Sequence, residues 1–291
     1  MNTKISVEQL LIELRKIASI DDQIWQESLS DRKIKEIEFH DKDRDRKKEV
    51  YAGINEDEVQ DTDTYEKFYG NRKYYQATAD SNNYVDDWIN NEARDKIFLD
   101  YACGNGKNAI KAAKAGAQLA IGLDISPISI ENCKEDAKKE GVEKNTFFFQ
   151  ADCENTKIPT GSIDRIICSG MLHHLDLTYA FPELRRILAS EGKILGVEAL
   201  DYNPAIKLYR NLTPQMRTEW EKSHILSLKD LKFGSNFFNV KTIKYWHMLS
   251  ILSPHIKFLG PLLNQIDRVI TKIPLLRLWS WIFTFELHAK D

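Results

Sequence analysis

The chain has 291 residues, a formal net charge of -3 and 42% hydrophobic residues. This content supplies a sizeable core, and the length fits one large α/β domain or a core with added pieces. A dedicated nucleic-acid binder usually carries a basic excess. The slight acidic excess argues against that class of protein, and we expect no nucleic acid as a partner.

Targeting and redox features indicate a cytoplasmic protein. The N-terminal sequence lacks the apolar centre of a signal peptide, and no stretch reaches the ~20 apolar residues of a spanning helix. The four cysteines form no C-x-x-C pair; they are Cys103, Cys133, Cys153 and Cys168. This spacing predicts separate, buried, reduced thiols, and we predict no metal ligands.

Two segments precede the regular part of the chain. Residues 1–20 carry apolar side chains at helical spacing and predict a short amphipathic helix. Residues 31–49 are almost all charged with interleaved signs, which is typical of a solvated helix or a mobile loop. We predict that residues 1–67 form a helical or lid-like extension, and that residues 68–291 form the main domain.

From residue 97 the sequence alternates between strand and helix patterns. The expected strands are 96–102, 119–126, 145–153, 163–169 and 192–200, and the expected helices are 107–117, 126–141 and 179–192. This alternation predicts an α/β fold with a doubly wound parallel sheet. Right-handed crossovers would place the carboxyl end of every strand at one edge, where ligands bind.

The pattern loosens after residue 201. We predict helical cap or lid insertions at 203–235 and 250–276, with two further strands at 236–249 and 280–290. The apolar tract that contains the second insertion fits a lid, a dimer interface or a membrane contact. We favour packing as a lid, and the chain is expected to be a monomer or a homodimer.

The stretch "LDYACGNGKNAI", residues 99–110, suits two cofactors. From Gly104 it reads G-x-G-x-x-A, a spelling of the dinucleotide fingerprint. Asp124, about twenty residues onward, can accept hydrogen bonds from ribose hydroxyls of NAD or of S-adenosylmethionine. Asp100 discriminates, because a carboxylate at the strand end repels a pyrophosphate but attracts the ammonium of S-adenosylmethionine. Asp152 is placed to accept from an adenine amino group, with the Cys153 N–H beside the ring.

Residues 97–201 resemble a class I S-adenosylmethionine-dependent methyltransferase. Four motifs carry the resemblance in order: "LDYACGNG", "GLDIS", "QADC" and "IDRIICSGMLHHL". Ala102 departs from the pattern, since the family usually has glycine there, and alanine favours a negative φ. The resemblance implies a Rossmann-like seven-stranded sheet with the last strand antiparallel. It also implies these cofactor contacts: Tyr75, Asp100, Ala102, Gly104, Gly106, Asp124, Ile125, Asp152, Cys153 and Ser169.

Methyl transfer needs a base only if the acceptor must lose a proton. His173 and His174 follow the fourth strand at the ligand edge, and His40 is a further candidate if the N-terminal arm folds over the site. His247, Glu198 and Asp201 are weaker candidates. No Asn-Pro-Pro-Tyr or Asp-Pro-Pro-Tyr sequence follows the strand, which disfavours methylation of amide nitrogens through that motif.

The leading hypothesis is a methyltransferase that uses S-adenosylmethionine to form an O-methyl or N-methyl product on a small molecule. Three alternatives stay open at this point. They are methylation of a lipid-linked or glycan acceptor at a membrane surface, an NAD(P)-dependent oxidoreductase, and a cofactor-binding scaffold without turnover.

Overall fold

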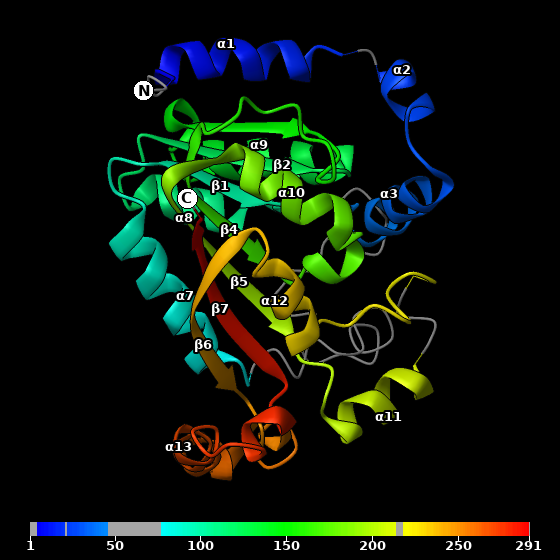
Figure 1. Cartoon of the computed structure of the whole chain (residues 1–291), viewed down its shortest axis with the longest axis vertical. Coiled ribbons are helices and arrows are strands. Elements are labelled where there is room, and N and C mark those ends of the chain that lie inside the picture. Colours follow the sequence, from blue (N-terminus) through cyan, green and yellow to red (C-terminus); the bar gives the residue numbers. More distant parts are fainter. Residues whose placement is uncertain (1–4, 21, 46–76, 214–217, 291) are drawn as a thin grey trace.

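The computed structural model describes residues 5–20, 22–45, 77–213 and 218–290. Tyr75 and the boundary between residues 67 and 68 lie outside these ranges, so their roles stay predictions. The described chain forms one seven-stranded sheet with helices on both faces, and further helices at its ends (Figure 1).

The sheet has the strand order β3-β2-β1-β4-β5-β7-β6. β1 to β5 pair in parallel, whereas β7 lies between β5 and β6 and is antiparallel to both. This topology confirms the predicted doubly wound sheet with an antiparallel last strand. The strands are β1 (Ile97–Tyr101), β2 (Leu119–Asp124), β3 (Thr146–Gln150), β4 (Ile163–Ser169), β5 (Leu188–Ala199), β6 (Phe238–Trp246) and β7 (Ile282–Ala289).

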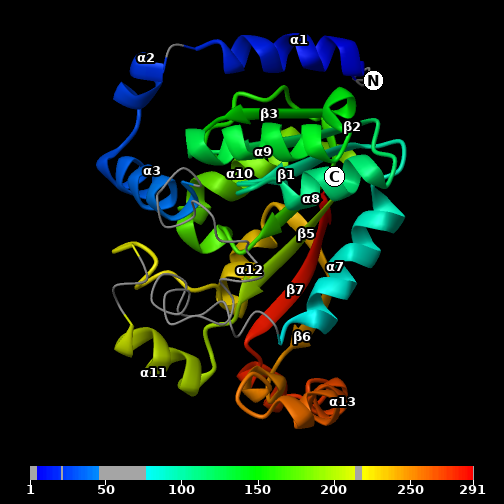
Figure 2. The ribbon, with the colours of Figure 1, turned by 180° about the vertical axis from the view of Figure 1, so that it is seen from behind.

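The helices form a layer on each face of the sheet, seen from opposite sides in Figures 1 and 2. Phe98 of β1 packs in the cluster that contains α7, α8 and α9, whereas its neighbour Leu99 packs in the cluster that contains α1 and α10. This alternation follows from the two-residue period of a strand. The helices are α1 (Val7–Ala18), α2 (Asp22–Glu27), α3 (Asp31–Arg44), α7 (Ala79–Glu92), α8 (Lys107–Lys114), α9 (Pro127–Lys139), α10 (Leu177–Ile187), α11 (Pro204–Leu212), α12 (Leu228–Gly234) and α13 (Gly260–Ile270).

Local sequence sets where several helices begin and end. Ser126 caps α9 by accepting from the Ser129 N–H at 3.0 Å, and Pro127 takes the first helical position, as the sequence predicts. The helix predicted to reach residue 192 is too long, because α10 ends at Ile187. The chain turns directly into β5 there, and Leu188 pairs with Ile163 of β4.

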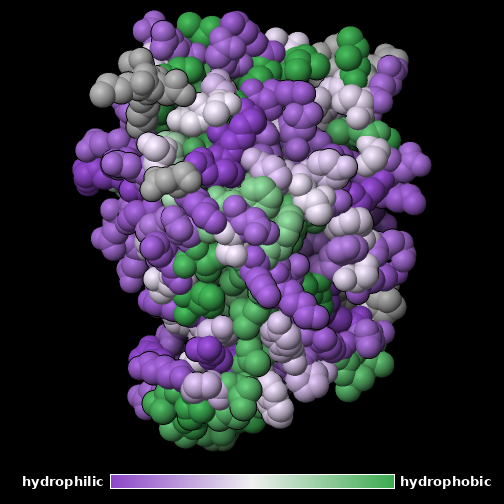
Figure 3. Space-filling view, in the orientation of Figure 1, coloured by the Kyte–Doolittle hydropathy of each residue, from purple (hydrophilic) through white to green (hydrophobic). Residues whose placement is uncertain are grey.

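Hydrophobic surface gathers at the end of the molecule formed by α13 (Figure 3). The exposed apolar side chains of this part of the chain are Leu252, Ile256, Phe258, Leu262, Val269, Ile273, Leu275, Leu276 and Trp279. None of the helices in the described ranges is long and apolar enough to cross a bilayer. The lid, interface and membrane interpretations of this segment stay predictions.

Candidate functional site

A cavity of about 150 Å³ lies where β1, β2, β3 and β4 end, as expected for a doubly wound sheet. Much of its lining comes from the loops that follow these strands. The structure brings nine of the predicted site residues to this cavity: His40, Ala102, Gly104, Asp124, Ile125, Asp152, Cys153, Ser169 and His174.

The loop between β1 and α8 is a tight turn in left-handed backbone. Ala102, Gly104 and Gly106 have φ values of 54°, 55° and 73°. The expectation of a negative φ at Ala102 is therefore wrong. The turn imposes the left-handed region at this position too, and alanine adopts it at a cost of about 1–2 kcal/mol. The Gly106 N–H bonds the Cys103 carbonyl at 2.8 Å and closes the turn.

Asp124 ties the glycine loop to the end of β2. One carboxylate oxygen accepts from the Gly104 N–H at 2.8 Å, and the other accepts from the Ser126 N–H at 3.0 Å. Arg44 of α3 approaches the first of these oxygens at 3.3 Å. The guanidinium carbon of Arg44 lies 3.5 Å from where a Cβ on Gly104 would stand, so this side chain covers the loop.

Asp152 occupies the corresponding position after β3. One oxygen accepts from the Glu154 N–H at 2.9 Å, and Lys33 of α3 bonds the other at 2.6 Å. Lys33 also pairs with Glu154 at 2.8 Å, and Arg32 pairs with Glu154 at 2.5 Å. Burial lowers the pKa of Lys33, but its bonds to the two carboxylates outweigh burial and raise it.

Helix α3 therefore contributes to the site. The helical alternative predicted for residues 31–49 is confirmed for Asp31–Arg44, but its full solvation is wrong, because Glu36 is buried. The cavity residues that sequence reasoning missed include Arg32, Lys33, Glu36, Arg44 and Glu154. A signal for α3 exists in the spacing, because residues 32, 36, 40 and 44 recur every four positions. Such residues share one helix face.

Asp100 lies at the end of β1, but it does not line the cavity. Its carboxylate accepts from the Ala109 N–H at 3.1 Å and from the Asn108 side chain at 3.5 Å. Burial raises the pKa of Asp100 to about 7. Gly106 also lies outside the lining, at the start of α8. Direct contacts of these two residues with a cofactor stay predictions.

We expect the Asp100→Asn variant to be more stable than the parent above neutral pH. The folded pKa of about 7 lies above the unfolded value of about 3.9, so Asp100 lowers stability progressively as pH rises from about 4 to 7. The amide oxygen of asparagine can still accept from Ala109. At pH 8 the variant should melt several degrees higher, at roughly 2–4 °C per kcal/mol. Thermal unfolding of both proteins at pH 5 and pH 8 tests this, and Asp86→Asn on α7 is the control. If the melting temperatures of variant and parent differ by the same amount at both pH values, the prediction is contradicted.

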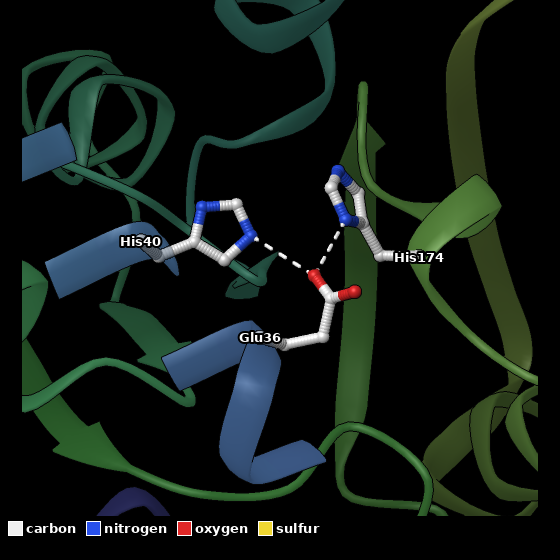
Figure 4. A group of neighbouring side chains, drawn as sticks. All are labelled: Glu36, His40 and His174. Atoms are coloured by element: carbon white, nitrogen blue, oxygen red, sulfur yellow. Dashed lines mark hydrogen bonds and ion pairs between the residues drawn. The ribbon is translucent and has the colours of Figure 1, made fainter. Parts of the chain in front are cut away.

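Two histidines and one glutamate form another wall of the cavity: His40, His174 and Glu36 (Figure 4). The Glu36 carboxylate lies 2.9 Å from Nδ1 of His174 and 3.5 Å from Nε2 of His40. Burial would raise the pKa of Glu36, but its bonds to His174 and His40 hold that pKa well below its usual range. The structure thus brings together two of the three predicted bases, His40 and His174, from segments that are far apart in the sequence.

His173 differs from His174 in position and charge. It lines a second cavity, and its Nδ1 lies 2.7 Å from Glu198, which also accepts from the N–H groups of Met171 and Leu172. Burial lowers the pKa of His173, but Glu198 and Glu221 outweigh it and raise the pKa to about 9. Burial and the neighbouring His173 lower the pKa of His174. A general base must be neutral, so His174 is the better candidate of the pair.

Comparison with known proteins identifies the central region. Residues 98–192 match the family model described as a methyltransferase domain. A 27-O-demethylrifamycin SV methyltransferase from Amycolatopsis mediterranei is 32% identical over 110 residues, which are 37% of this chain and 40% of the relative. A ribosomal protein L11 methyltransferase from Pasteurella multocida is 28% identical over 115 residues, 39% of this chain and 37% of the relative. The chain thus spans about two fifths of the length of these curated relatives.

Solved structures share the fold over a larger part of the chain. A geranyl diphosphate C-methyltransferase from Streptomyces coelicolor A3(2) superposes with a TM-score of 0.55 and 15% identity, covering 79% of this chain and 87% of that one. Residues 98–192, which match the family model, contain the glycine loop, Asp124 and Asp152, and these line the cavity. From the order of its motifs, the family match and the strand topology, the chain carries a class I S-adenosylmethionine-dependent methyltransferase domain.

Proposed function

We propose that the protein is an S-adenosylmethionine-dependent methyltransferase that acts on a small molecule, by O- or N-methylation. The observation that carries this proposal is the convergence of the glycine loop, Asp124 and Asp152 on one cavity inside the methyltransferase domain. When bound, S-adenosylmethionine supplies an electrophilic methyl group on a cationic sulfur.

The residues of the sheet edge fit this cofactor. Asp124, Asp152 and Glu154 are carboxylates and line the cavity. Carboxylates accept hydrogen bonds from ribose hydroxyls and from an adenine amino group, and they attract a cation. The match to a methyltransferase family model favours this cofactor over the NAD(P)-dependent alternative.

The cofactor must displace side chains of α3. The cavity of about 150 Å³ is smaller than the roughly 300–1,000 Å³ of small-molecule sites. Lys33 and Arg44 currently bond Asp152 and Asp124, the two carboxylates proposed to hold adenine and ribose. The cofactor's amino and hydroxyl groups would replace these cations as hydrogen-bond donors.

A small acceptor is supported by the enclosure of the site. Side chains of α3 and the loop after β4 wall the cavity together. The relatives named above methylate acceptors as different as a rifamycin and a ribosomal protein, and their similarity is confined to part of each chain. The acceptor is therefore argued from the cavity rather than from those names.

Calorimetric titration of the purified protein tests the cofactor. We expect S-adenosylmethionine and S-adenosylhomocysteine each to bind with a stoichiometry of one per chain at the same site. NAD⁺ and NADH should give no heat of binding. Binding of NADH in place of S-adenosylhomocysteine would overturn the proposal. Transfer of a labelled methyl group into a small-molecule fraction rather than a protein fraction then tests the acceptor class. Cofactor binding without transfer to any fraction would support the scaffold alternative instead.

A further inference from the structure

We propose that Glu36, His40 and His174 form a binding site for a divalent first-row transition metal, at one wall of the cavity that is proposed to hold the cofactor. The three side chains come from α3 and from the loop after β4, and all of them line the same cavity as Gly104 and Asp124. Their ligand atoms lie within 4.8 Å of one another. The metal part of this inference does not depend on the proposed methyl transfer.

The geometry is close to what such an ion requires. Nitrogen and carboxylate ligands lie about 2.0–2.2 Å from Zn²⁺, which sets ligand atoms of a tetrahedral site roughly 3.3 Å apart. The distances from Glu36 Oε2 to His174 Nδ1 and His40 Nε2, 2.9 and 3.5 Å, bracket this value. Figure 4 shows the Glu36 carboxylate directed between the two imidazoles. Only small side-chain shifts would be needed to place an ion among them.

The chemistry of the three ligands points to a transition metal. Two imidazoles and one carboxylate suit Zn²⁺ and its neighbours in the first row, whereas Mg²⁺ prefers oxygen ligands. The other carboxylates of the cavity are paired with cations of α3: Asp124 with Arg44, Asp152 with Lys33, and Glu154 with Arg32 and Lys33. Glu36 instead faces two histidines, and that arrangement leaves a carboxylate available to a metal.

A further carboxylate orients one of the ligands. A metal-binding histidine usually directs its second ring nitrogen to a carboxylate or carbonyl. Nε2 of His174 lies 3.5 Å from Glu221, which is itself held by the Thr218 N–H at 2.8 Å. If Nδ1 of His174 binds the ion, Nε2 carries the proton and faces Glu221. Glu221 is therefore a positioning residue for the metal site.

The site would select the acceptor if the proposed function holds. Three protein ligands leave at least one coordination position open, as in catalytic zinc sites. The open position would face the cavity, which Ser169 at the end of β4 and Gly170 and Met171 of the following loop also line. An acceptor bearing an ionisable oxygen would bind there, because a metal stabilises the oxygen anion. This role in acceptor binding rests on the proposed function, whereas binding of the ion does not.

Titration with Zn²⁺ alone tests the site on the full chain after removal of metal with a chelator. We expect one Zn²⁺ per chain, and at least 30-fold weaker binding in Glu36→Gln and in His40→Ala. Glu221→Gln should weaken binding about tenfold, within the range seen when a supporting carboxylate is lost. His288→Ala is the matched control: this histidine faces one carboxylate, Glu286, at 3.3 Å on β7. Circular dichroism and melting curves identify any variant that fails to fold, and Glu36→Gln preserves side-chain volume.

Substitution of Co²⁺ for Zn²⁺ supplies a second measurement. Visible absorption without a thiolate charge-transfer band is expected, because the ligands are nitrogen and oxygen. Absence of stoichiometric metal binding, equal binding by the three variants and the parent, or a thiolate band would each overturn the metal site. Those results would leave the cofactor titration untouched, and failure of the cofactor titration would leave the Zn²⁺ result standing.

Discussion

Replacing Asp124 with alanine should weaken binding of S-adenosylmethionine by at least 100-fold. A carboxylate that accepts two ribose hydroxyl bonds contributes about 1.5–3 kcal/mol for each, because one partner is charged. The substitution also releases the Gly104 and Ser126 N–H groups, which bond this carboxylate at 2.8 and 3.0 Å. The cofactor would thus lose both its partner and an ordered loop. Calorimetry on folded variant protein gives the affinity directly.

Two further variants separate these contributions. Asp124→Asn keeps an acceptor oxygen for the loop and should bind the cofactor with an affinity between those of the parent and the alanine variant. Asp86→Ala removes a surface carboxylate of α7 that pairs with Lys111, and it should bind like the parent. Parental affinity in Asp124→Ala would refute the assignment of this carboxylate to the ribose.

Replacing Gly106 with alanine should destabilise the protein by about 2–5 kcal/mol and disorder the loop that follows β1. The left-handed backbone costs a non-glycine residue about 1–2 kcal/mol, and overpacking adds about 1–3 kcal/mol. Gly106 has a φ of 73°, and an added Cβ would lie 2.8 Å from the sulfur of Cys133 and 3.0 Å from the ring of Phe148. Urea unfolding measures the loss, and cofactor affinity should fall with it.

Gly141 provides the matched control for this substitution. Its φ of 69° is nearly that of Gly106, but an added Cβ would meet no atom within 4 Å. Gly141→Ala should therefore cost only the backbone term, about 1–2 kcal/mol. The double variant Gly106→Ala/Cys133→Ala should recover part of the packing loss. Equal destabilisation by the two single glycine substitutions would show that the crowding around Gly106 has no energetic effect.

The sequence predicts the sheet edge well because each of its residues is determined by neighbours in the chain. Asp124 and Asp152 directly follow runs of strand-forming residues, so their place at the carboxyl edge follows from the period of the strands and right-handed crossovers. The start of α9 follows similarly from Ser126 and Pro127. The seven-stranded sheet and its antiparallel last strand come from the family resemblance, and the structure confirms them.

The contribution of α3 could not be derived in the same way. A run of interleaved charges is compatible with full solvation, and the partners that bury Glu36 and Lys33 lie more than 100 residues away. The orientation of Asp100 depends on whether its carboxylate is solvated in the cavity or bonds the N–H of Ala109 at the start of α8. The residue pattern of the strand does not distinguish these two orientations. Long-range charge pairing, rather than local propensity, sets this half of the site.

The position of α3 has a consequence for the order in which ligands bind. Arg44 and Lys33 of this helix hold the two carboxylates proposed for the cofactor, while Glu36 and His40 of the same helix belong to the proposed metal site. A helix of 14 residues moves largely as a unit, so displacing it for one ligand shifts the groups that meet the other. Binding of the cofactor and binding of the metal ion are then thermodynamically linked. Each ligand changes the affinity for the other by the same factor.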